Sequence, residues 1–274
     1  MLDQSILDVP LIFLDTETTG LNPRFGDRMV EIALARFRGD VMEDYFVTLL
    51  NPDRPISPGA ERIHGLTDAQ VREAPYFAEI IPQLRAALVE GVVVAHNAPF
   101  DLGFVSNEFH LAHQECPDNL ALDTLALLRG YFNFPSNSLP KVAARLGIQP
   151  GRSHRALDDV LTTRAVFSYM ADELGRRGAH TLGDFLRWQG GAVAWRTAAR
   201  PDVPLPPALE EALRLNRQVF LRYVDDAGAQ TERWVSPIAV RSDRDYLYLR
   251  AFCHLRNGER SFRLDRVLEM RVGE

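Results

Sequence analysis

Lysine is almost missing from this sequence. Lys141 is the only one, and arginine supplies all the other basic residues among the 31. A guanidinium is a planar fork of donors that suits bidentate contact with phosphate. The basic side chains that are present are therefore well suited to a phosphate-bearing ligand.

Cysteine and long apolar runs are also scarce. The two cysteines, Cys116 and Cys253, lie far apart and have no Cys or His at zinc-ligand spacing, which argues against a disulfide framework and a zinc site. No run approaches the 18 apolar residues of a membrane helix, and residues 1–4 lack the basic start of a signal peptide. We therefore expect a soluble, cytoplasmic protein without membrane contact.

The net charge of −6 is unevenly distributed along the chain. Acidic residues outnumber basic ones in residues 1–175, whereas arginines outnumber acids in residues 176–274. An acidic first part is poorly suited to holding nucleic acid unless cations neutralise it. The basic last part is the better candidate for phosphate contact.

Residues 11–20 are the most informative stretch of the sequence. Four large apolar residues predict a strand buried on both faces, and this strand runs into Asp15 and Glu17. Side chains two apart in a strand share a face, so these carboxylates should lie side by side. Such a pair is either solvated at a strand end or, because like charges repel, bound to a divalent cation.

The remaining pattern up to residue 175 predicts an α/β domain with a mixed sheet flanked by helices. Residues 29–38 and 41–50 form a hairpin signal around Gly39-Asp40, and residues 92–95 are a second doubly buried strand. Helical periodicity appears in four segments, at residues 77–90, 102–111, 138–146 and 156–174. The second buried strand leads into Asp101, which we place in the first turn of a helix.

A change of composition follows. Residues 176–207 are rich in glycine and proline and are interpreted as a linker that includes a short helix near residues 182–188. Residues 208–216 form a small amphipathic helix, and four strand patterns follow, at residues 219–223, 233–240, 246–253 and 261–271. We therefore predict an α/β domain over residues 1–175 and a small all-β, barrel-like domain over residues 208–274.

Asp15, Glu17, Asp101 and Asp159 would crowd one sheet edge with negative charge. Two divalent metal ions, Mg²⁺ or Mn²⁺, would balance these acids and could clamp the oxygens of a phosphodiester. His154, just before the last helix, suits the role of general base near neutral pH. Each residue has a plainer alternative: Asp101 as an acid at a helix N-terminus, His154 as a loop residue, and Asp158 rather than Asp159 facing the site.

In the order of the chain, these motifs resemble those of the DEDDh 3′-to-5′ exonucleases, the superfamily of the polymerase III epsilon proofreading subunit. The matching segments are Asp15-Thr16-Glu17-Thr18-Thr19-Gly20, His96-Asn97-Ala98-Pro99-Phe100-Asp101 and His154-Arg155-Ala156-Leu157-Asp158-Asp159. The resemblance covers roughly residues 8–175. It implies a ribonuclease-H-like fold, four metal-ligating acids, His154 as general base, and contacts from Thr18, Asn97 and His64 to the terminal nucleotide.

The last part resembles the WYL domain, a small β barrel of SH3/Sm-like type. The resemblance rests on Leu247-Tyr248-Leu249 and on the run Arg260-Ser261-Phe262-Arg263-Leu264-Asp265-Arg266, although the family's tryptophan is replaced by Leu247. It implies that Arg260, Arg263 and Arg266 bind nucleic acid or a regulatory ligand. The alternative is that Phe262 is a core residue and the arginines pair with surface acids.

Together these features predict a two-metal exonuclease that releases nucleoside 5′-monophosphates from the 3′ ends of DNA, with single strands favoured. Nucleic acid is the expected partner, and association with replication or repair proteins is left open. The alternatives are an RNA-trimming enzyme of the same superfamily, since recognition of the 2′-OH is not readable here, and a nucleic-acid-binding regulator that uses the nuclease domain as a scaffold.

Overall fold

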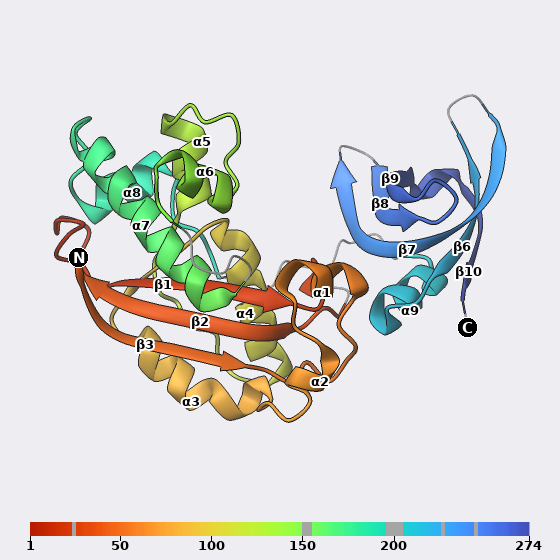
Figure 1. Cartoon of the computed structure of the whole chain (residues 1–274), viewed down its shortest axis with the longest axis horizontal. Coiled ribbons are helices and arrows are strands. Elements are labelled where there is room, and N and C mark those ends of the chain that lie inside the picture. The colour runs from red at the N-terminus through yellow and green to blue at the C-terminus, as the bar shows by residue number, and fades with distance from the viewer. Residues whose placement is uncertain (24–25, 150–154, 196–204, 226–227, 244–245, 274) are drawn as a thin grey trace.

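The chain folds into two units, each built on its own five-stranded sheet (Figure 1). The computed structural model describes residues 1–23, 26–149, 155–195, 205–225, 228–243 and 246–273. The first unit carries the strand with the paired acids, and the second contains the WYL-like pattern.

The sheet of the first unit is mixed, with the strand order β3-β2-β1-β4-β5. Both hairpin pairings, β1 with β2 and β2 with β3, are antiparallel, whereas β1, β4 and β5 run parallel. The predicted ribonuclease-H-like mixed sheet is therefore confirmed. Its strands are β1 (Leu11–Thr18), β2 (Met29–Arg38), β3 (Val41–Leu49), β4 (Val92–Ala95) and β5 (Ala121–Asp123).

Alternation along β1 divides its apolar side chains between two separate cores. Phe13 packs edge-on against Phe37 of β2 and against Phe167 of the helix at residues 156–175, each with ring centroids 5.7 Å apart, in the core covered by the helices that follow β5. Ile12 and Leu14 point to the other face, which the helices at residues 77–88 and 98–111 cover. The apolar residues of β1 are buried on both faces, as their uninterrupted run predicts.

Helices lie on both faces of this sheet (Figure 1). The short α1 and α2 lie between β3 and α3 in the chain. Among the described residues, none of the helices combines the length and apolar character that crossing a membrane requires. The helices of the first unit are α1 (Pro58–His64), α2 (Asp68–Val71), α3 (Phe77–Leu88), α4 (Ala98–Leu111), α5 (Thr124–Tyr131), α6 (Leu139–Arg145), α7 (Ala156–Gly175) and α8 (Leu182–Trp188).

The segment after α7 packs on the first unit. Phe185 of α8 is fully buried in the core beside Phe167, with ring centroids 5.7 Å apart. The Gln189 side chain accepts a hydrogen bond from Asp123 N and donates one to Ala121 O, and the Trp195 indole donates to Asn119 O. Residues 176–195, which we expected to belong to a linker, therefore contribute to the first unit's packing.

The second unit is an antiparallel sheet with the strand order β10-β6-β7-β8-β9, and α9 packs against its core. The pattern at residues 261–271, expected as one strand, is divided into β9, a 3-10 turn and β10. At this turn the Arg263 guanidinium binds the Asp265 carboxylate. The elements are α9 (Pro207–Leu215), β6 (Val219–Val224), β7 (Gln230–Asp243), β8 (Tyr246–Cys253), β9 (Gly258–Arg263), η2 (Leu264–Arg266) and β10 (Val267–Val272).

Candidate active site

Three acids meet at the carboxyl end of β1. Asp15 and Glu17 share the strand face that α7 covers, and Asp159 is on the first turns of α7. Carboxylate oxygens of these three residues lie within 4.8 Å of one another. A cluster of carboxylate oxygens is the ligand chemistry that Mg²⁺ and Mn²⁺ prefer, so this donor set fits a divalent metal ion. Asp159 is buried and belongs to the cluster, as predicted.

Asp101 approaches the same strand end from the other face of the sheet. It is in the first turn of α4, as expected, and only 3% exposed. Its Oδ1 accepts hydrogen bonds from the backbone N of Thr16 at 3.0 Å and from Thr16 Oγ1 at 2.7 Å. Because Thr16 lies between Asp15 and Glu17 in the strand, Asp101 is fixed directly to the backbone that carries both acids.

The crowding of these acids changes their ionisation. Burial and then the charges of Asp101 and Glu17 raise the pKa of Asp15 well above its usual value. Burial, followed by the charge of Asp159, raises the pKa of Glu17 to about 8. Burial also raises the pKa of Asp101 to about 7, although the bonds from Thr16 oppose this shift. Carboxylates that are difficult to ionise together are stabilised as anions by a bound cation.

His154, the predicted general base, lies outside the described residues. The structure describes the chain again from Arg155, the N-cap of α7. The assignment of His154 therefore stays a prediction from the sequence.

Two further buried acids flank the site, and the sequence reasoning missed both. Glu31 of β2 is 2% exposed and lies directly opposite Glu17 in the strand register. Asp123 ends β5 and accepts hydrogen bonds from the backbone N of Asn97 and of Leu125. A single charge inside an apolar strand pattern, such as Val30-Glu31-Ile32, was the available signal.

Among the residues expected to touch the terminal nucleotide, Asn97 is exposed at the end of β4, in the left-handed backbone region with φ of 76°. Thr18 is buried and its hydroxyl donates to Gly20 O. His64 is buried at the end of α1, where its Nδ1 accepts a hydrogen bond from Leu66 N. Their contacts to substrate remain predictions.

The three predicted arginines of the second unit do not form one row. Arg260 is exposed on β9, whereas Arg263 is bound to Asp265 and Arg266 lies in the 3-10 turn. The Arg263 hydrogen bonds lower the pKa of the Asp265 carboxyl. Phe262, between the arginines, is a core residue.

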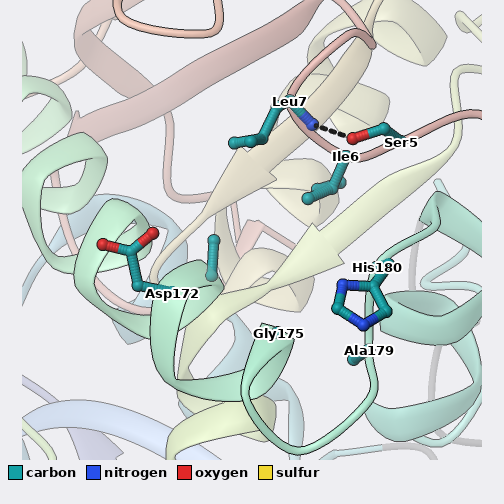
Figure 2. Close-up of a pocket in the computed structure, with 8 residues that line it drawn as sticks. Ser5, Ile6, Leu7, Asp172, Gly175, Ala179 and His180 are labelled. Carbon is teal, nitrogen blue, oxygen red and sulfur yellow. Dashed lines mark hydrogen bonds between the residues drawn. The ribbon is translucent and has the colours of Figure 1, made fainter.

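A separate small pocket lies at the other end of α7 (Figure 2). Asp172, which lines this pocket, is 13 residues beyond Asp159, roughly 20 Å along a helix of 1.5 Å rise per residue. The pocket therefore does not belong to the acidic cluster. It is lined by Ser5, Ile6, Leu7, Ala171, Asp172, Gly175, Ala179 and His180.

Comparison with known families agrees with this geometry. Residues 12–167 match the exonuclease family, and residues 205–272 match the WYL domain. The chain belongs to the exonuclease family, whose DEDDh members use divalent metal ions. Both resemblances found in the sequence are thereby confirmed.

Relatives match over the first unit. A DNA polymerase III subunit epsilon-like protein of Rhodobacter capsulatus is 37% identical over 194 residues, which are 67% of this chain and 27% of that protein. A PolC-type DNA polymerase III of Thermotoga maritima is 32% identical over 182 residues, 66% of this chain and 13% of that protein. The structure of Exonuclease X with 5′ overhanging duplex DNA superposes with a TM-score of 0.52 at 27% identity, covering 66% of this chain and 99% of that one.

Proposed function

We propose that this protein is a metal-dependent 3′-to-5′ exonuclease that hydrolyses single-stranded DNA to nucleoside 5′-monophosphates. The observation that carries the proposal is the cluster of Asp15, Glu17 and Asp159 at the carboxyl end of β1. Asp101 completes the set of four acids, and together these residues would hold two ions, Mg²⁺ or Mn²⁺. When bound, the ions would supply Lewis acidity toward the phosphodiester and a more acidic water.

The protein's own groups have separate roles in this proposal. Thr16 orients Asp101 through two hydrogen bonds. The exposed Asn97, together with Thr18, would orient the terminal nucleotide. His154 would accept the proton of the attacking water, because an imidazole is half-ionised near neutral pH.

The second unit is proposed to hold the part of the nucleic acid strand that leads away from the acidic cluster. Its arginines, among them Arg260, Arg263 and Arg266, balance the acidic first unit, which offers few phosphate contacts. Removing one arginine that binds a single-strand phosphate should reduce the slope of log affinity against log salt by roughly 0.7. Replacing Arg260 with Gln tests the most exposed of the three. An unchanged slope would favour a small ligand or a protein partner for this unit.

The activity is tested with oligonucleotides labelled at the 5′ end and incubated with Mg²⁺ or Mn²⁺. Single- and double-stranded DNA and RNA are compared, because the exoribonuclease alternative differs only in its preference for a 2′-OH. The proposal expects progressive shortening from the 3′ end and release of 5′-monophosphates. Products with internal cuts, or no products with any substrate and either metal, would contradict it.

A further inference from the structure

Glu31 is a fifth acid beside the four proposed ligands, and its oxygens are occupied. Arg155 Nη2 donates to Oε1 at 2.6 Å, and Arg155 Nε lies 3.2 and 3.1 Å from the two oxygens. Ala156 N donates to Oε2 at 3.0 Å. A carboxylate that accepts from a guanidinium and a backbone N–H, at 2% exposure, is committed to these partners and is poorly placed to serve as a metal ligand.

These partners connect two parts of the candidate site. Glu31 belongs to β2 and lies opposite Glu17 of β1 in an antiparallel register. Arg155 is the N-cap of α7, and its carbonyl accepts the hydrogen bond of Asp159 N at 3.0 Å. The bonds of Glu31 therefore run from β2, which is paired with the strand that carries Asp15 and Glu17, to the helical turn that carries Asp159.

We propose that Glu31 and Arg155 form a positioning pair, which fixes the first turn of α7 so that Asp159 faces Asp15 and Glu17. The inference rests on the proposed function, because it concerns the same metal site. The carboxylate also lies at the N-terminus of α7, where a negative charge is stabilised by the unpaired N–H groups. Without this pair, only the apolar packing of residues such as Ala156 and Val160 would hold this end of α7 against the repulsion between Asp159 and two like charges.

Positioning and simple electrostatics both predict weaker metal binding for Glu31→Gln, but they predict opposite effects for Arg155→Gln. Glu31→Gln removes a negative charge near the metal, and Arg155→Gln removes a positive one. If charge alone mattered, the first would weaken and the second would tighten the binding of a cation. If the pair positions Asp159, both substitutions weaken binding.

The experiment measures Mn²⁺ affinity of the full-length protein by titration calorimetry, and the single-turnover rate at saturating Mn²⁺. We expect both variants to bind Mn²⁺ on the order of tenfold more weakly, the usual cost of losing an outer support of a metal site, and to turn over more slowly. Arg164→Gln is the matched control, since it removes an arginine–carboxylate pair between α7 and Asp40, which is 97% exposed. Its affinity and rate should match the wild type.

Two outcomes would overturn the inference: an Arg155→Gln variant that binds Mn²⁺ as tightly as the wild type or more tightly with unchanged turnover, or a wild-type protein that binds no Mn²⁺. Because the Arg155 side chain is 35% exposed, its variant decides the question even if Glu31→Gln does not fold. A wild type that binds Mn²⁺ but cleaves no nucleic acid would refute the proposed function while the affinity comparison still decides the role of the pair.

Discussion

The guanidinium of Arg54 donates a hydrogen bond to the main-chain carbonyl of Leu213, at 3.1 Å, and so joins the first unit to the C-terminal end of α9. The same guanidinium lies 3.3 Å from Asp27, whose carboxylate accepts hydrogen bonds from Thr19 Oγ1 and Asn22 N. Thr19 follows the acid motif by two residues. Arg54 thus links the second unit to the loop that follows the acid motif.

Replacing Arg54 with Ala should destabilise the first unit. Burial raises the pKa of Asp27, and the Arg54 charge opposes this shift. Loss of the guanidinium leaves a buried carboxylate without its cation, at a cost of about 1–3 kcal/mol. Urea unfolding measures the change, and a combined Arg54→Ala, Asp27→Asn variant should recover part of the stability. A single variant as stable as the wild type would show that the pair contributes little.

Asp15→Asn should separate metal binding from folding. The amide removes one charge from a repelling cluster, so the metal-free protein should melt at a higher temperature. It also removes a proposed ligand, so the rise in melting temperature that Mn²⁺ gives the wild type by mass action should disappear, together with nuclease activity. Asp158→Asn, on the turn of α7 that also carries Asp159, is the control that should keep the metal-induced rise in melting temperature and the nuclease activity. A full metal response in Asp15→Asn would reject this ligand assignment.

The metal-free protein should lose stability as the pH rises. The folded-state pKa of Glu17, about 8, lies above its ordinary value of 4.5. Between these pH values the folded state therefore holds a proton that the unfolded state has already released. The contribution of protonated Glu17 to the free energy of unfolding is fully present below pH 4.5 and is lost as the pH rises to about 8. Melting curves from pH 5 to 9 in the presence of a chelator test this. Glu17→Gln should flatten the decline, and a wild type whose stability is constant over this range would contradict it.

His154→Ala should reduce turnover without removing the metal. Loss of a general base typically costs 10²–10⁴ in rate, and no ligand role is proposed for this imidazole. Single-turnover cleavage measures the rate, and calorimetry with Mn²⁺ measures the binding. A variant that no longer binds Mn²⁺ would move His154 into the metal coordination sphere.

Comparing two truncated chains, one ending after Trp195 and one ending after Gly175, should show where the first unit ends. A chain that ends after Trp195 should fold and cleave short oligonucleotides, with weaker affinity for long strands. A chain that ends after Gly175 also loses Leu182 and Phe185, each fully buried and each worth about 1.5–3 kcal/mol. That loss is a large part of the 5–15 kcal/mol typical of a domain. Circular dichroism and melting of the two products test this, and equal stability would restore the boundary at residue 175.

The sequence predicted what depends on short-range pattern. The apolar run before Asp15, the hairpin around Gly39-Asp40 and the helix that begins near Ala156 are all present in the structure. It did not predict partners that are distant in the chain. Nothing near Gln189 indicates that its side chain would bind the backbone of β5, and nothing near Glu31 indicates that Arg155 would be its partner. Such contacts depend on tertiary packing, which local periodicity does not encode.

Strand β1 is covered on both faces, and its first part, Leu11–Phe13, is paired along both edges, whereas Asp15 and Glu17 pair only with β2. Segments of this kind open only when the whole domain unfolds, so their amides exchange with solvent last. Asp15 and Glu17 therefore follow directly on the part of the first unit that fluctuates least. In an evolving lineage, the acids could be exchanged for other side chains at this strand end while the rigid support beneath them persisted.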